Sequence, residues 1–126
     1  MLFKPDSLDD VLNARKTQTV RLKQPRLKIG KTYAVQTSFR SPSKGRIRIT
    51  GLRQGTLRAL NDADLAREGW AGRRAEFEQY FAQVNHFAPK TMSPDDWEQL
   101  RDTPLWVIDF EPAPNPESDD TGPPPA

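Results

Sequence analysis

The side chains best suited to chemistry lie close together in the sequence, at Lys16, Thr17, Thr19 and Arg21. The stretch from residue 17 to residue 22 is rich in β-branched residues, which favours a strand. A strand points alternate side chains to one face, so Thr17, Thr19 and Arg21 are expected to share a face. Lys16 precedes the strand in a turn, from which its side chain can reach the same face. We therefore expect two hydroxyls, an ammonium and a guanidinium to converge.

Two kinds of site fit this group of residues. Positive charge combined with hydroxyls is suited to binding an anion such as a phosphate. A threonine beside an amine is suited to nucleophilic catalysis, but an ordinary lysine, with a pKa of about 10.4, is protonated at neutral pH. We expect the like charges of Arg15 and Arg21, together with burial, to favour the neutral amine. The structural alternative is a solvated strand whose threonines make cross-strand hydrogen bonds.

The remaining strands predict a curled sheet or small barrel. Besides residues 17–22, strands are expected over residues 32–37, 46–50 and 105–110. Isoleucine and arginine alternate strictly over residues 46–50, which places the isoleucines inside and the arginines outside. Because this pattern continues irregularly past Gly51, we expect a bent or bulged strand there.

Helices are expected on both sides of this strand region. The first covers about residues 6–15, with Asp6 or Ser7 as its N-cap. The second covers residues 62–68 and is ended by Gly69 in the left-handed conformation. The third covers about residues 73–87 and carries Phe77, Tyr80, Phe81 and Val84 on one face. A fourth begins at a Ser93 cap.

The composition excludes several classes of enzyme. The 126-residue chain has no cysteine, which excludes disulfides, thiol catalysis and thiolate metal sites. Its single histidine, His86, argues against a histidine-rich metal site and, as a neighbour of Phe87 on a helix face, is expected to be structural. We therefore expect no metal and no cofactor.

Positive and negative charges are divided unevenly along the sequence. Residues 1–58 carry fourteen Lys and Arg against three Asp, whereas the remainder carries five against fourteen Asp and Glu. The basic half is expected to create a field that favours a phosphate or another anion. In the alternative, the two halves neutralise each other across the fold.

Two units are expected: a domain over residues 1–111 and a tail over residues 112–126. The tail is acidic, contains six of the twelve prolines and has no Lys or Arg, which is typical of a disordered segment. The sequence has no apolar run of the roughly 18 residues that a membrane span requires. The cytoplasm is the expected location.

The order of these elements resembles the ASCH family, whose signature is a Gly-x-Lys-x-x-x-x-Arg loop and strand. Lys16 and Arg21 match that signature by spacing, while Ala14 stands at the glycine position. The resemblance extends over about residues 3–111. It implies an α+β fold: a small PUA-like (ASCH) β-barrel with flanking helices.

Within this family, the small bacterial members include amidohydrolases that remove acyl groups from N4-acylcytidines. The resemblance implies that Thr19 attacks the amide carbonyl, that Lys16 takes its proton, and that Glu68 protonates the departing amine. Arg21 then positions the loop or the ligand. Independently, Glu68 lies in the last turn of a predicted helix, where the macrodipole disfavours a carboxylate. Its structural alternative is a side chain that is solvated or paired with Arg67 or Arg21.

Further residues are expected to bind the substrate, namely Thr17, Trp70, Tyr33, Phe39 and Arg40. Trp70 follows Glu68 closely, and Tyr33 and Phe39 are expected at the mouth of the barrel. The expected partner is a nucleoside, and the protein is expected to be a monomer or a weak homodimer. The alternative function is an RNA-binding or ribonuclease module that uses its basic barrel face, including the segment from Arg40 to Arg48.

Overall fold

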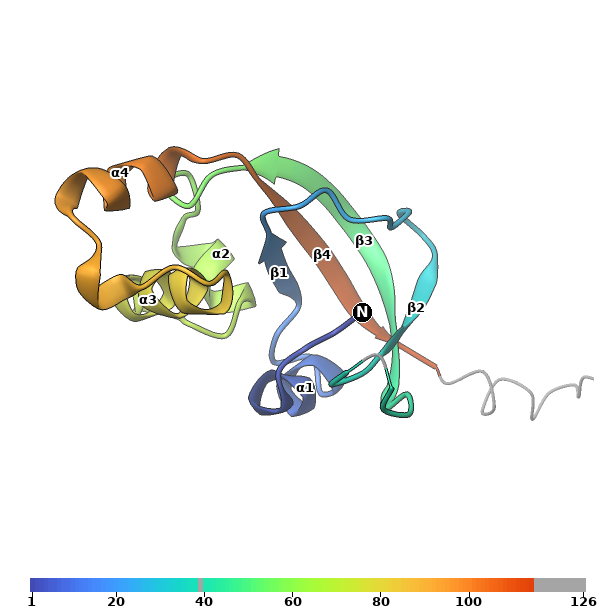
Figure 1. The fold of residues 1–126 in the computed structure, drawn as a ribbon. Helices are drawn as coiled ribbons and strands as arrows, with labels where there is room; N and C mark the ends of the chain where they lie inside the picture. Colours follow the sequence, from blue (N-terminus) through green and yellow to red (C-terminus); the bar gives the residue numbers. More distant parts are fainter. Residues whose placement is uncertain (39, 115–126) are drawn as a thin grey trace, which may run out of the picture.

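A strongly bent antiparallel sheet of four strands organises the protein. The computed structural model describes residues 1–38 and 40–114. The strands lie in the order β1-β4-β3-β2 (Figure 1), with β1 at Gln18–Arg21, β2 at Thr32–Val35, β3 at Gly45–Gly55 and β4 at Leu105–Ala113. The long central strands β3 and β4 pair along most of their length, and the short strands β1 and β2 form the two edges.

The central strands follow the alternation that the sequence predicts. Ile47 and Ile49 of β3 are fully buried, while Arg46 and Arg48 between them remain partly exposed. The expected irregularity is a register shift between Ile49 and Gly51. A side chain at Gly51 would force Asp109 to move, because a Cβ there would lie 2.7 Å from Asp109 Oδ2. The shift increases the local twist and helps the sheet to curl.

The N-terminal segment lies across the opening between the two edge strands. Leu2 forms a parallel bridge with Gln36, just after β2, and the guanidinium of Arg21 on β1 donates to the carbonyl of Leu2 at 3.0 Å. Phe3 packs into the core between these contacts. The predicted α+β architecture, a small barrel with flanking helices, is confirmed in the form of a curled half-barrel.

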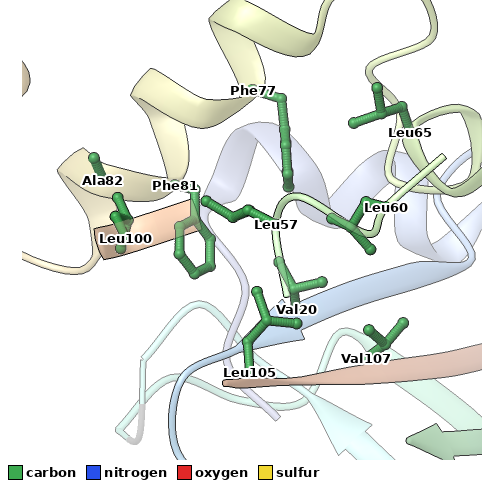
Figure 2. Packing of buried hydrophobic residues seen from close by; sticks show 10 residues of the cluster. All are labelled: Val20, Leu57, Leu60, Leu65, Phe77, Phe81, Ala82, Leu100, Leu105 and Val107. Carbon is green, nitrogen blue, oxygen red and sulfur yellow. The ribbon is translucent and has the colours of Figure 1, made fainter. Parts of the chain in front are cut away.

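Two hydrophobic clusters stabilise the domain on opposite faces of β4. Ile108 and Phe110 face the inside of the curl, where helix α1 (Pro5–Leu12) packs through Leu8 and Val11. Leu105 and Val107 face the other way. There they meet helices α2 (Asp62–Arg67), α3 (Arg74–Val84) and α4 (Pro94–Asp102) in the cluster drawn in Figure 2. Figure 1 shows these three helices gathered at one end of the sheet, with the short turn η1 (Pro89–Thr91) between α3 and α4.

Several predicted boundaries are wrong by a few residues. The N-cap of α1 is Lys4, neither Asp6 nor Ser7, because Pro5 occupies the first helical turn, and the helix already ends at Leu12. Helix α3 ends at Val84, so His86 does not lie on the helix and instead adopts a left-handed conformation with φ of 68°. Strand β4 continues to Ala113, two residues into the segment predicted as a tail; residues 115–126 lie outside the described part.

Within the described residues, no helix has both the length and the apolar character needed to cross a membrane.

The turn between α1 and β1 contains a strained residue. Ala14 has a φ of 61°, in the left-handed region that glycine adopts without cost. The strain is held in place by hydrogen bonds from the amides of Arg15 and Lys16 to the carbonyl of Asp10 at 2.8 and 3.0 Å. The position that matches the glycine of the resembled signature is therefore occupied here by an alanine in a conformation that favours glycine.

Ala14→Gly is expected to raise the free energy of unfolding by about 0.5–1 kcal/mol. Glycine avoids the cost of about 1–2 kcal/mol that a Cβ imposes in this conformation, and its larger loss of backbone entropy offsets part of the gain. Urea denaturation measures the change. The control is Ala66→Gly, at an exposed position of α2, which should lower stability by about 1 kcal/mol. A loss of stability in both variants would contradict the assignment of strain to Ala14.

Candidate functional site

A buried ion pair joins the two segments that the sequence singled out. Lys16 Nζ lies 2.7 Å from Glu68 Oε2 and 3.3 Å from the backbone carbonyl of Glu68. Only 9% of the Lys16 side chain and 1% of the Glu68 side chain are exposed. The alternative of a solvated Glu68 is therefore wrong.

Glu68 is held at this position by the way α2 begins and ends. Asn61 and Asp64 form a capping box that fixes the start of the helix. Glu68 is the C-cap, and Gly69 follows with a φ of 86°, the left-handed residue that the sequence predicts. The amide of Thr17 donates to the carbonyl of Arg67 at 2.8 Å, which ties the end of α2 to the start of β1.

The strained turn positions Lys16 beside Glu68 and directs the side chain of Arg15 to the surface. Arg15 lies on the surface and pairs with Asp9 and Asp10 at 2.6 and 2.8 Å. Arg15 therefore does not supply the like charge that we expected it to exert on Lys16, because two nearby carboxylates neutralise it.

Burial raises the pKa of the Glu68 carboxyl above its ordinary range, and the ammonium of Lys16 acts in the opposite direction. Burial disfavours the carboxylate because a protein interior solvates charge poorly. Glu68 Oε1 is buried with no hydrogen-bond partner among the described residues, and the same holds for Gln18 Nε2. Burial therefore opposes the carboxylate form of Glu68, while the adjacent ammonium of Lys16 favours it.

A network of side chains from α2 and β3 fixes Gln18, which is fully buried. The guanidinium of Arg67 donates to Gln18 Oε1 at 3.0 Å and to Asp64 Oδ1 at 2.6 Å. Arg53 of β3 donates to the same carboxylate oxygen at 3.0 Å. These bonds orient the Gln18 amide.

A cavity of about 330 Å³ adjoins the ion pair. Lys16, Thr19, Arg21 and Glu68 all line it, so the structure brings together four of the predicted site residues. Thr19 is 7% exposed, and its hydroxyl makes no hydrogen bond with the described residues. It is therefore free to meet a ligand.

The free edge of β1 forms one wall of the cavity. The amide of Phe110 donates to the carbonyl of Thr17, which makes residues 17 and 110 a hydrogen-bonded pair. Such pairs alternate along an antiparallel ladder, so Thr19 and Arg21 bond to β4 while the amide and carbonyl of Val20 face away from it. Since Val20 lines the cavity, it offers one backbone donor and one acceptor there.

Arg21 crosses from β1 to the N-terminal segment. Its guanidinium carbon lies 5.4 Å from the centre of the Phe3 ring, and its Nε is buried without a partner among the described residues. Burial lowers the pKa of Arg21, although the charge of Glu68 opposes this.

Several residues that were predicted to bind substrate do not line the cavity. Thr17 precedes β1 and lies outside it, and Arg40 lies in the exposed turn before β3. Trp70 packs on Phe77 and Tyr80, under the guanidinium of Arg73. The hydroxyl of Tyr33 accepts a hydrogen bond from the amide of Lys28. Phe39 lies outside the described residues.

The opposite wall comes from α3, which the sequence did not assign to the site. Phe77, Tyr80, Phe81 and Val84 line the cavity. Their helical spacing was visible in the sequence and predicted an apolar face. However, the contact between that face and β1 is a tertiary contact between segments some sixty residues apart, which spacing cannot reveal.

Solved structures with the same arrangement include an ASCH domain from Lactobacillus crispatus, with a TM-score of 0.58 and 17% identity over 82% of this chain and 68% of that one. ASCH from Zymomonas mobilis has a TM-score of 0.54 and 11% identity, covering 96% and 75% of the two chains. The chain has the ASCH fold. A protein of Enterococcus faecalis from the DUF984 family is also similar, with a TM-score of 0.58 and 18% identity over 84% of this chain and 69% of that one.

The sequence by itself matches no family model and no curated protein. The similarity to ASCH domains is therefore one of fold, and the role of each residue has to be argued from this chain.

Removing one member of the buried pair is expected to destabilise the protein more than removing both. Glu68→Leu leaves the Lys16 ammonium without its partner, and the expected cost is about 3–5 kcal/mol. Lys16→Met combined with Glu68→Leu is expected to restore the free energy of unfolding to within about 1 kcal/mol of the parent. Urea denaturation of the two single variants and the double variant measures this. Costs that simply add in the double variant would contradict a direct coupling of the two groups.

The Lys16→Met variant is expected to lose stability as the pH rises. Without the ammonium only the raising effect of burial remains large, so the pKa of Glu68 in the folded state exceeds its ordinary value of 4.5. A group of this kind contributes full stability below its unfolded pKa and loses it as the pH rises through the folded value. Unfolding free energies measured from pH 4 upward test the sign, with Lys16→Met plus Glu68→Leu as the control that lacks this dependence.

Proposed function

We propose that this protein is an amidohydrolase that cleaves the N4-acyl amide of acylated cytidines such as N4-acetylcytidine. The observation that carries the proposal is the buried Lys16–Glu68 pair, 2.7 Å apart, in the same cavity as the hydroxyl of Thr19. Ion pairs of this kind add little to stability compared with apolar residues, so a chemical role accounts better for their presence.

The pair supplies both proton-transfer groups that the reaction needs. When the shared proton moves from Lys16 to Glu68, Lys16 becomes a neutral base and Glu68 an acid. Thr19 Oγ attacks the acyl carbon and its proton passes to Lys16. The C–N bond then breaks, Glu68 protonates the exocyclic nitrogen, cytidine leaves, and the acyl group remains as an ester on Thr19.

Water completes the cycle with the same two groups. After the first half, Lys16 is an ammonium and Glu68 a carboxylate. The carboxylate takes a proton from the attacking water, and the ammonium returns a proton to Thr19 Oγ as the ester bond breaks. The carboxylic acid is released, and both groups regain the protonation states from which they began.

The walls of the cavity suit a nucleobase that carries an acyl group. The apolar side chains of α3 face the base, while the free amide and carbonyl of Val20 are placed to pair with its polar edge. A volume of about 330 Å³ lies within the range typical of small-molecule sites.

Incubation with N4-acetylcytidine tests the proposal directly. The parent is expected to release cytidine, and Thr19→Ala, Lys16→Ala and Glu68→Ala are each expected to lower kcat/KM by at least about 100-fold. Thr17→Ala is the matched control, since it removes the same hydroxyl from a residue outside the cavity, and it should retain activity. Chromatographic separation of cytidine from its acetyl derivative measures turnover.

Circular dichroism separates loss of catalysis from loss of folding in these variants. Turnover that survives Thr19→Ala in a folded protein would show that Thr19 is not the nucleophile. Absence of turnover by the parent on a series of N4-acylated cytosines and cytidines would overturn the proposed function.

RNA binding is a second candidate function, favoured by the basic loop between β1 and β2. Lys23, Arg26, Lys28 and Lys31 have no ion-pair partner among the described residues. Binding through many phosphates would give an affinity that falls steeply with salt. Micromolar or tighter binding of an oligoribonucleotide near physiological salt, combined with absent hydrolysis, would favour this function over the first.

A further inference from the structure

The residues that line the cavity carry an excess of positive charge. Three of them, Lys4, Lys16 and Arg21, are basic, and only Glu68 is acidic. Lys16 and Glu68 neutralise each other through their ion pair. Lys4 and Arg21 are left, and neither forms a salt bridge with a described carboxylate. A cavity of this composition favours a ligand that carries negative charge.

Arg21 is the better placed of the two cations. Its side chain is held over the Phe3 ring and donates to the carbonyl of Leu2, yet Nε is buried and has no partner among the described residues. Although the charge of Glu68 acts on Arg21, no described carboxylate forms a salt bridge with it, and an anion in the cavity would further compensate the burial of the guanidinium.

Lys4 lines the same cavity as Arg21 and directly follows Leu2 and Phe3, the two residues that Arg21 contacts. Lys4 is exposed, with an extended backbone at the start of α1, and the hydroxyl-bearing residues Ser7 and Thr37 also line the cavity. The name anion-binding subsite is used below for Lys4, Ser7, Arg21 and Thr37.

We propose that the anion-binding subsite binds the 5′-phosphate of the substrate, so that the preferred ligand is an N4-acylated cytidine monophosphate and not the free nucleoside. The inference rests on the proposed function, which places the acyl amide of the ligand at Thr19, and it adds a binding site for the phosphate of the same ligand. Thr19 and Arg21 lie on the same face of β1, roughly 7 Å apart along the strand. A nucleotide presents its exocyclic amide and its phosphate at opposite ends, so one ligand can meet Thr19 with the first and Arg21 with the second.

Calorimetric titration with the products CMP and cytidine tests the subsite without requiring any catalysis. CMP is expected to bind at least about tenfold more tightly than cytidine, because the added phosphate makes charge-assisted hydrogen bonds. Lys4→Met is expected to reduce this preference several-fold. The matched control is Lys31→Met. Lys31 lies just before β2, at the opposite end of that strand from Thr37, and does not line the cavity. This variant removes the same charge and should leave the preference for CMP unchanged.

Each outcome of the titration decides the inference. Equal affinity for CMP and cytidine would overturn it, as would equal effects of Lys4→Met and Lys31→Met, which would indicate attraction by the general positive field. Tighter binding of an oligoribonucleotide than of CMP would also overturn it and would identify RNA as the ligand. A retained preference for CMP without hydrolysis of any acylated cytidine would support the subsite while refuting the amidohydrolase, so the two failures are distinguishable.

Discussion

The salt bridge between Lys16 and Glu68 is the interaction on which the remaining features of the site depend. Two ionisable groups are removed from water, and only their mutual attraction and a few hydrogen bonds compensate the loss of hydration. Such a pair requires accurate placement of both partners. The capping box fixes the start of α2 and Gly69 its end, which together place Glu68. The strained turn at Ala14 places Lys16. The hydrogen bond from the amide of Thr17 to the carbonyl of Arg67 joins the two segments. These local structures together hold Lys16 Nζ 2.7 Å from Glu68 Oε2.

The cavity exists because β1 lies at the edge of the curled sheet. An edge strand has one side free of backbone partners, and proteins usually cover or blunt that side. Here α3 approaches from one direction and the segment from Leu2 to Lys4 from the other, and the space between them remains open. The same edge therefore supplies the side chains of Thr19 and Arg21 and the backbone groups of Val20. A central strand could not do this, because its backbone groups bond on both sides.

The local features of the site followed from the sequence, and the tertiary ones did not. Alternation over β3, the left-handed Gly69 and the grouping of Lys16, Thr19 and Arg21 are properties of neighbouring residues, so spacing was sufficient to predict them. Glu68 was found through the resemblance to the ASCH family and through its unfavourable place at a helix end. Trp70 and Tyr33 were assigned to the cavity by proximity in sequence or by analogy with a barrel mouth. Instead, the packing of Trp70 on Tyr80 and the bond from Lys28 to the Tyr33 hydroxyl direct both rings elsewhere. The wall formed by α3 depends on how helices pack at the end of the sheet, which no local pattern specifies.

The departures from ordinary protein chemistry are concentrated in one place. Ala14 holds a conformation that favours glycine, while Gln18 Nε2, Arg21 Nε and Glu68 Oε1 are buried without partners among the described residues. With the exception of the left-handed His86, the rest of the described chain obeys the usual rules: isoleucines alternate into the core, both capping boxes are complete, and Arg15 and Arg58 pair with nearby carboxylates. Strain and unsatisfied polar groups persist only where the surrounding structure enforces them, and they accumulate at functional sites. Of these three residues, Arg21 and Glu68 line the cavity, so a polar ligand there would meet two groups that the protein itself leaves unpaired.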